Sequence, residues 1–201
     1  MERLTDSQID IIRELIEESL QKAALSMEQM LRIRVEPDHI IFGNGPLDSI
    51  SEFDFLGRFK VHLVKVNFKG QIKGAFYFII NAHEVDLIND VSLPPGFSSD
   101  NRSENKMMKH GFMSEIENLI AALSLDEISK FLGVQLQSEV PEIQILKGSD
   151  VNLYLENENN TINTAFHVKC VLSGTAVNIS PFFIWMLDQN FIKQLKLNIV
   201  S

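Results

Sequence analysis

The same order of predicted elements occurs twice in this chain, and the repeat restricts the possible folds more than any other feature. In each copy a long amphipathic helix is followed by strand-like segments, a hairpin and a further helix. The copies cover about 6–92 and about 104–196, and the linker at 92–103 is rich in proline, glycine and serine. The repeat predicts one α+β domain over 1–201, with two similar halves in pseudo-two-fold relation and long helices packed on a central antiparallel sheet.

The first copy opens with apolar residues at helical spacing, which predict a helix over about 6–32. The stretch 37–45, which begins with proline, ends that helix. The segments FKVHLVKVNF and QIKGAFYFII then alternate in polarity around Lys69-Gly70, a pattern that predicts an antiparallel hairpin. A short helix is expected over about 83–91.

The second copy opens with a helix predicted over about 104–132, which Gly133 ends. Strand-like patterns follow in VQLQSEVPEIQIL, DVNLYLE and TAFHVKCVL, and Ser173-Gly174 are expected to turn into a strand over TAVNIS. Ser180 and Pro181 suit the N-cap and the first position of a helix, so the last helix is expected over PFFIWMLDQNFIKQL. The predicted core side of the long helix consists of Phe112, Ile116, Leu119, Ile120, Leu123 and Phe131.

The charge of the chain restricts its partners. The formal net charge is −9, and lysine and arginine form no run, so neither nucleic acid nor an anionic membrane is expected to bind. An acidic surface instead favours basic regions of other proteins. The first residues, MERLTDSQID, lack the apolar core of a signal peptide, and the longest apolar runs fall short of the ~20 residues that a bilayer requires. A cytoplasmic location is therefore expected.

A narrow stripe of small and polar residues follows the second long helix, turned away from its predicted core side: Gly111, Glu115, Asn118 and Ala122. Asparagine is a below-average choice inside a helix, because its amide competes for the backbone. Glu115 and Asn118 are surface neighbours that can reach the same small volume of a docked partner, and the glycine and alanine allow close approach. Spacing alone is more typical of a solvated helix side that carries these residues by chance.

Other reactive residues form no recognisable motif. The five histidines lack the HxH and HExxH spacings, so no metal site is expected. The glycines of FGNGP at 42–46 lack the Lys-Ser/Thr of a phosphate-binding loop and predict a turn. Cys170 is interpreted as a small buried hydrophobe. The cluster Phe182, Phe183, Trp185 and Met186 is interpreted as core, with a subunit interface as the alternative.

The segment EIENLIAALSLDEISKFLG, with Pro141 in SEVPEI, resembles the CheC/CheX/FliY family of bacterial chemotaxis phosphatases. The signature of that family is Asp or Ser, three residues, Glu, two residues, Asn, twenty-two residues and Pro. Glu115, Asn118 and Pro141 match it at those separations. QIDIIRELIEE, VEP and FKGQIKGAFYFII are similar to the N-terminal repeat and hairpin of CheC, so the resemblance implies a CheC-like fold.

The chain departs from the signature in both halves. In the second half Gly111 stands where the family has Asp or Ser, and Glu117 replaces a small residue, so its added charge is expected to reshape the contact surface. In the first half Asp10 and Glu14 match, but Glu17 occupies the asparagine position and no proline follows at the family distance. The first site therefore resembles a degenerate one, and a solvated acidic helix side is the alternative interpretation.

The resemblance implies hydrolysis of the aspartyl phosphate of a CheY-like response regulator. Asn118 would orient the attacking water, and Glu115 would pair with a lysine of the regulator. The regulator brings its own Mg²⁺, so this chain is expected to need no cofactor of its own. The alternative is a non-catalytic CheC-like module that binds a response regulator, a CheD-like deamidase or a flagellar switch protein. Gly111 and Glu117 favour the module, whereas the Glu–Asn–Pro spacing favours the enzyme.

Overall fold

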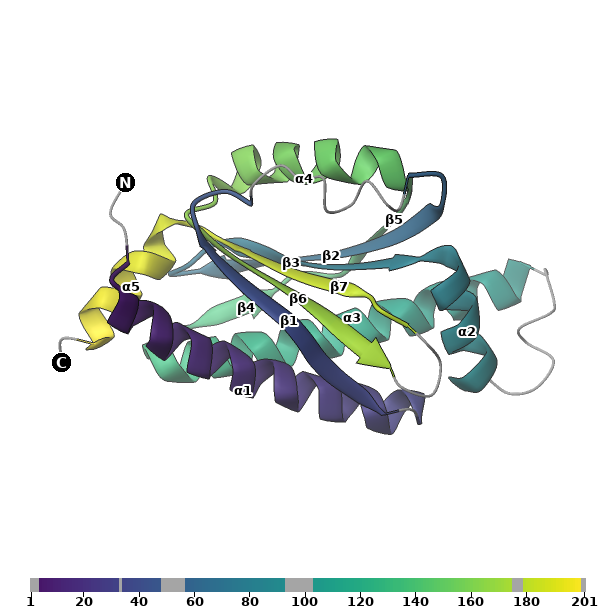
Figure 1. The fold of residues 1–201 in the computed structure, drawn as a ribbon, viewed down its shortest axis with the longest axis horizontal. Helices are drawn as coiled ribbons and strands as arrows, with labels where there is room; N and C mark the ends of the chain where they lie inside the picture. Colours follow the sequence, from purple (N-terminus) through teal and green to yellow (C-terminus); the bar gives the residue numbers. More distant parts are fainter. Residues whose placement is uncertain (1–3, 33, 48–56, 93–102, 175–178, 200–201) are drawn as a thin grey trace.

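A seven-stranded sheet organises the protein (Figure 1). The computed structural model describes residues 4–32, 34–47, 57–92, 103–174 and 179–199. The strand order is β1, β6, β7, β3, β2 and β4, and β5 also pairs with β2. All paired strands are antiparallel. The strands are β1 (Val35–Asn44), β2 (Lys60–Gly70), β3 (Gly74–Asn81), β4 (Leu136–Ser138), β5 (Glu142–Lys147), β6 (Phe166–Gly174) and β7 (Phe182–Leu187).

Each half of the chain supplies outer strands to the hairpin of the other half. Strand β1 of the first half pairs with β6, whereas β4 and β5 of the second half pair with β2. The inner strands β3 and β7 pair with each other at the middle of the sheet. This arrangement confirms the predicted α+β fold, with two similar halves around a central antiparallel sheet.

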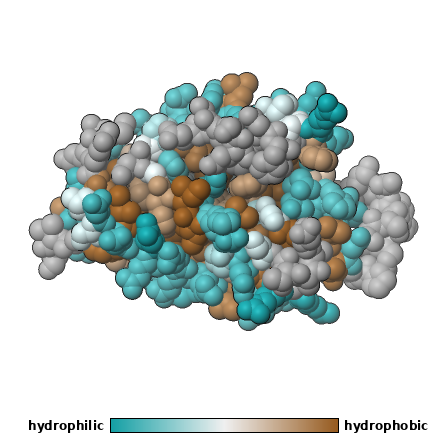
Figure 2. Space-filling view, in the orientation of Figure 1, coloured by the Kyte–Doolittle hydropathy of each residue, from teal (hydrophilic) through white to brown (hydrophobic). Residues whose placement is uncertain are grey.

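Helices cover both faces of the sheet (Figure 1). In the described part of the chain one face carries four helices, and its core includes Ile16, Ile120 and Phe191. The other face carries a single helix among the described residues, which packs through Val151 and Leu155. Apolar residues gather across the middle of the face shown in Figure 2, over the strands. The four helices are α1 (Asp6–Leu31), α2 (Ala82–Ser92), α3 (Ser103–Leu132) and α5 (Gln189–Ile199), and the single helix is α4 (Gly148–Ile162).

The two long helices, α1 and α3, run antiparallel beside each other (Figure 1). Helix α1 begins with a capping box, in which the backbone N–H of Gln8 donates to the Thr5 hydroxyl at 3.3 Å. The Gln8 side chain accepts from the Thr5 N–H at 3.0 Å. An ion pair of 2.9 Å joins Lys22 on α1 to Glu127 on α3. The predicted long helices are thus present, with boundaries within about two residues of those expected.

The prediction of a strand over DVNLYLE is wrong, because these residues lie in α4. Val151, Leu155 and Asn159 are buried at a spacing of four residues, whereas Leu153 is 62% exposed. Alternating apolar residues imitate a strand over this short stretch. The helical period becomes clear only when the segment is extended to Asn159.

The prediction of a helix that starts at Ser180 is also wrong. Residues Phe182–Leu187 form β7, and α5 begins only after Asp188, whose carboxylate accepts from the backbone N–H of Asn190 at 3.1 Å. Strand β7 lies inside the sheet, and its side chains are buried on both faces except for the half-buried first one. A short apolar run of this kind fits a buried strand and a buried helix equally well.

Strand β1 was not predicted, since Pro37 was interpreted only as the end of the first helix. Proline is compatible with β1 because this strand lies at an edge of the sheet. The turn expected at 42–46 is partly wrong, because residues 42–44 belong to β1, and Gly45, with φ of 104°, and Pro46 lie beyond it. The predicted linker at 92–103 lies largely outside the described residues, as does the predicted strand TAVNIS.

Candidate functional site

The four stripe residues lie on one side of α3, away from its fully buried side. Gly111, Glu115 and Ala122 are exposed, and Asn118 is half-buried. Among the described residues, the side chains of Glu115 and Asn118 form no hydrogen bond and no ion pair. A carboxylate and an amide are therefore available, one helical turn apart, to an approaching molecule.

The observed buried side of α3 is rotated about the helix axis relative to the predicted core side. Ile116 and Ile120 are buried as predicted, but the other predicted core residues are only half-buried. These half-buried residues are Phe112, Leu119, Leu123 and Phe131. The buried positions that were not predicted are Met113, Glu117, Ala121, Ser124, Leu125, Ile128 and Leu132.

Glu117 is the unexpected member of the buried side. Its side chain is fully buried, and neither carboxylate oxygen has a hydrogen-bond partner among the residues that the structure describes. Burial raises the pKa of this carboxyl well above its usual range, so the protonated form is favoured. The expectation that the charge of Glu117 reshapes the contact surface is therefore wrong, because the side chain does not reach that surface.

The acidic residues of the first half occupy the corresponding side of α1. Asp10, Glu14 and Glu17 are all exposed at helical spacing. The three side chains form a stripe of carboxylates in which no amide stands at the position equivalent to Asn118. This stripe thus lacks a neutral group that could both accept and donate a hydrogen bond.

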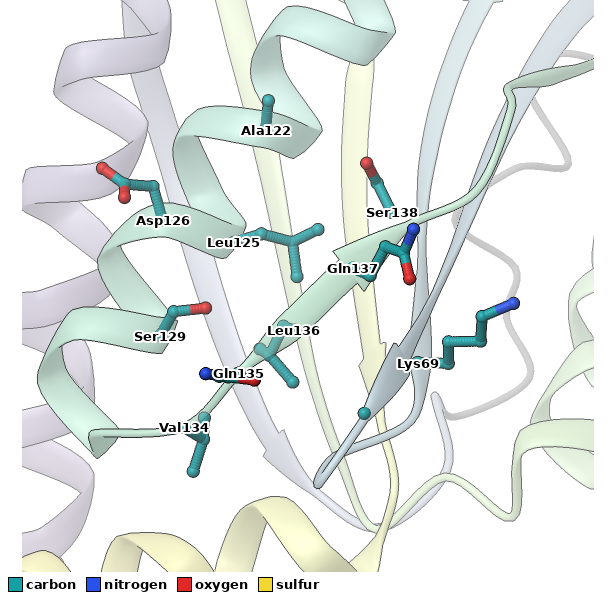
Figure 3. A pocket seen from close by; sticks show the side chains of 11 residues that line it. Lys69, Ala122, Leu125, Asp126, Ser129, Val134, Gln135, Leu136, Gln137 and Ser138 are labelled. Carbon is teal, nitrogen blue, oxygen red and sulfur yellow. The ribbon is translucent and has the colours of Figure 1, made fainter.

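The stripe on α3 leads into a groove that sequence reasoning missed (Figure 3). The groove has a volume of about 710 Å³ and lies between α3, β4 and the end of β2. Ala122 belongs to both the stripe and the groove, and Asp126 and Ser129 continue the same helix side. The helical spacing of Asp126 and Ser129 could have extended the stripe, but only the fold shows that β4 lies opposite. Pro141 follows β4 and is half-buried just before β5.

Cys170 and the aromatic cluster belong to the core. Cys170 is fully buried, and burial raises the pKa of its thiol to about 12, so the reactive thiolate is disfavoured. Phe183, Trp185 and Met186 are buried in β7, and Phe182 is half-buried. The interpretations of Cys170 and of the aromatic cluster as core residues are both confirmed.

Neither a metal centre nor a membrane span is recognisable in the described part of the chain. Its His, Cys, Asp and Glu side chains form no group of three or more that could hold a metal ion. None of its helices combines the length and apolar character that crossing a membrane requires.

Comparisons with known proteins identify the fold through structure and not through sequence. No family model matches the chain, and no curated protein matches it. FliY of Thermotoga maritima is similar in structure with a TM-score of 0.69 and 15% identity, over 99% of this chain and 98% of that chain. A chain of the FliM–SpeE complex of H. pylori gives a TM-score of 0.61 and 10% identity, over 99% and 100% of the two chains.

A third similar structure is the complex of CheX with CheY, BeF3 and Mg²⁺ from Borrelia burgdorferi. Its matching chain gives a TM-score of 0.57 and 17% identity, over 87% of this chain and 98% of that chain. The predicted CheC-like architecture is thus found in solved structures that extend over nearly all of this chain. The protein has the fold shared by the CheC, CheX, FliY and FliM proteins.

Proposed function

We propose that this protein hydrolyses the aspartyl phosphate of a CheY-like response regulator in bacterial chemotaxis. The observation that carries the proposal is the presentation of Glu115 and Asn118 on one outer side of a long helix, with Gly111 and Ala122 on either side. A partner can approach this side closely. The fold, shared with a CheX that is complexed with CheY, supports the same partner class.

Asn118 would position the attacking water. An acyl phosphate is already reactive, so a phosphatase needs chiefly to hold water in line with the phosphorus. The amide accepts one hydrogen bond from the water and donates another, and it does so without a change of charge with pH. Half-burial restricts the side chain of Asn118. Less side-chain entropy is therefore lost when the amide holds the water.

Glu115 would orient the docked regulator. Its exposed carboxylate can pair with the regulator's active-site lysine, and such charge-assisted hydrogen bonds are both strong and directional. The net charge of −9 favours the approach of a basic region. The Mg²⁺ that neutralises the phosphoryl oxygens would be the regulator's own, so no metal site of this chain takes part in the proposal.

Gly111 is unnecessary for the fold itself, which supports a role at a contact surface. A Cβ atom added there would meet no other atom of the described residues within 4 Å. Glycine inside a helix costs about 0.5–1 kcal/mol relative to alanine. A close approach by a partner's backbone would account for this cost.

A second candidate function is binding without catalysis. The similarity in fold to a chain of the FliM–SpeE complex favours it, as does glycine at the Asp or Ser position of the signature. The partner would then be a response regulator, a CheD-like deamidase or a flagellar switch protein. Such a module would retain a regulator without shortening the lifetime of its phosphate.

The test is the decay of a CheY-type regulator that has been phosphorylated with acetyl phosphate, with and without the protein. We expect faster phosphate release, and Asn118→Ala should slow the catalysed step about 10²–10³-fold, as loss of one oriented donor does in other enzymes. Asn160→Ala, an exposed asparagine on α4, is the matched control and should behave as the parent. Association with the BeF3-loaded regulator is measured in parallel.

Each outcome separates the two functions. Faster decay that requires Asn118 supports the phosphatase. Association without any change in lifetime contradicts catalysis and supports the binding module. Full activity in Asn118→Ala would show that another group positions the water.

A further inference from the structure

The outer strand beside β2 is interrupted where β4 passes into β5. The pairing of β4 extends to a hydrogen bond of 2.7 Å, in which the backbone N–H of Glu139 donates to the carbonyl of Asn67. The pairing of β5 begins with Glu142 opposite Lys65. One residue of β2 therefore lies opposite two residues of the outer strand, Val140 and Pro141. Two residues opposite one define a β-bulge, a feature that is common at sheet edges and beside functional sites.

The bulge turns an apolar side chain outward. Proline is compatible with a bulge, because it has no N–H to contribute to a ladder. Pro141 is half-buried, whereas the side chain of Val140 is 83% exposed. Among the described residues, Val140 is the most exposed of the large apolar side chains. The fold thus presents this valine to the solvent.

The bulge lies beside the middle of the stripe on α3. Near the start of the stripe, the ring centroids of His110 and His62 are 5.8 Å apart, and His62 pairs with Ile145 of β5. At the end of the stripe, Ala122 and Ser138 line the same groove from opposite sides (Figure 3). The outer strand therefore runs along α3 between these two points, and the bulge falls between them.

Asn118 faces this outer strand. Leu125 and Ser129 line the groove opposite β4, and they follow Asn118 by seven and eleven positions. At about 100° per residue, both point within about 20° of the direction of Asn118. Half-burial of Asn118 agrees with partial cover by the strand. The proposed water-positioning amide and the bulge therefore border one surface.

Carboxylates surround the exposed valine. Glu139 and Glu142 lie on either side of the bulge, and both are exposed, as is Glu115 on α3. Lys69 offsets the charge of Glu139 through an ion pair of 2.9 Å, so the other two carboxylates make the surface acidic. Single exposed apolar side chains are common on proteins, but an apolar centre with a charged rim is the usual anatomy of an interface. This surface complements a partner that has an apolar area flanked by basic groups.

We propose that Val140 is a docking residue for the response regulator, an inference that rests on the proposed function. Its isopropyl group contacts an apolar part of the regulator surface beside the phosphorylated aspartate, and Glu115 and Glu142 pair with basic groups around that part. Both α3 and the outer strand then hold the regulator, which places the phosphoryl group against Asn118. Val140 touches no reacting atom, so it contributes to affinity and not to the chemical step.

Variants of Val140 separate these two contributions. Affinity for the BeF3-loaded regulator and the rate of phosphate release are measured over a range of protein concentrations. Val140→Ala should raise the dissociation constant and the half-saturating concentration about three- to tenfold. Val140→Arg should raise both at least about tenfold, because it also repels basic groups. The maximal rate should stay within about twofold of that of the parent. Val140→Ile, which keeps the apolar surface, should bind as the parent does.

Leu153→Ala and Leu153→Arg are the matched controls. Leu153 is 62% exposed on α4, the helix on the other face of the sheet, so neither substitution should change binding or release. Urea unfolding of all variants should match the parent, since both side chains are exposed.

The outcomes distinguish this inference from the proposed function. Unchanged affinity in Val140→Ala and Val140→Arg would overturn the docking role, whether or not the maximal rate falls, and would leave the phosphatase proposal in place. Binding that depends on Val140 without faster release would support the docking role and contradict the phosphatase. A parent protein that binds no regulator would contradict both.

Discussion

Glu117 and Asn118 are adjacent on α3 but have opposite surroundings, since the side chain of Glu117 is fully buried and that of Asn118 reaches the surface. Successive helix positions differ in direction by about 100°, which is enough to separate core from surface. The residue beside the proposed water-positioning amide is thus a buried acid whose carboxylate oxygens have no hydrogen-bond partner in the described part of the chain. Burial of the Glu117 carboxyl is expected to destabilise the fold. This group lies next to the candidate site without being part of its surface.

Replacing Glu117 should change how the stability of the protein depends on pH. Burial raises the pKa of Glu117 in the folded state, whereas the unfolded state keeps an ordinary value near 4.5. As the pH rises above that value, the unfolded chain loses this proton and the folded chain retains it. The free energy of unfolding therefore falls with rising pH until the folded-state pKa is passed, by up to about 1.4 kcal/mol per pH unit.

Glu117→Gln removes this titration, so its unfolding free energy should exceed that of the parent more at pH 8 than at pH 5. Urea unfolding at several pH values measures the difference. Glu115→Gln is the control on the same helix, because the Glu115 side chain is exposed. Parallel pH profiles for the parent and Glu117→Gln would show that Glu117 does not titrate abnormally.

Gly111→Ala should stabilise the protein and weaken the association with a regulator. The added methyl group would meet none of the described residues, so the gain in helix propensity should be about 0.5–1 kcal/mol in urea unfolding. The same methyl group would obstruct a partner that approaches the stripe. Gly133→Ala is the contrasting variant, because Gly133 has φ of 61° and alanine is strained there. Tighter regulator binding by Gly111→Ala would exclude close approach as the reason for the glycine.

Glu115→Gln should weaken regulator binding more than it slows hydrolysis. Loss of one charge-assisted hydrogen bond is expected to raise the dissociation constant about tenfold, with a smaller dependence on salt concentration. Binding to the BeF3-loaded regulator at two salt concentrations measures this effect. Glu14→Gln, the corresponding exposed position on α1, should leave binding unchanged if the first site is degenerate. An equal loss in both variants would instead assign a binding role to the first half.

The elements that the sequence predicts well are those whose period is visible locally. The β2–β3 hairpin has alternating β-branched and aromatic residues, and α1 and α3 have long runs at helical spacing. The stripe on α3 follows from that spacing alone. Strand β7 escaped prediction because FFIWML is apolar throughout, and only the neighbouring strands and the covered faces of the sheet determine its conformation.

The features that sequence reasoning missed at the sites depend on contacts between distant segments. His62 lies in the first half and His110 in the second, on either side of the linker, yet their rings are neighbours. The groove beside Ala122 exists only because β4 adds to β2 of the other half. Burial of Glu117 likewise depends on the packing of α3 against the sheet and α1. A single sequence carries no local pattern for such contacts.

A buried ionic cluster connects α4 to the sheet and should be sensitive to the loss of one partner. Lys65 Nζ and the Tyr77 hydroxyl both contact Oε2 of Glu158, each at 2.6 Å. The side chains of Lys65 and Glu158 are only 12% and 13% exposed. Burial and the hydrogen bond to Glu158 raise the pKa of Tyr77, so its hydroxyl remains a donor at all ordinary pH values.

Lys65→Met should destabilise the protein by about 3 kcal/mol, because it leaves the largely buried Glu158 carboxylate without its counter-charge. The double variant Lys65→Met/Glu158→Met should recover most of that loss, since both charges are then removed together. Lys69→Met removes a lysine from the same strand, but its partner Glu139 is exposed, so the cost should stay below about 1 kcal/mol. Urea unfolding of the four proteins measures these differences. Equal costs for Lys65→Met and Lys69→Met would mean that water screens the Glu158 cluster as effectively as it screens the surface pair.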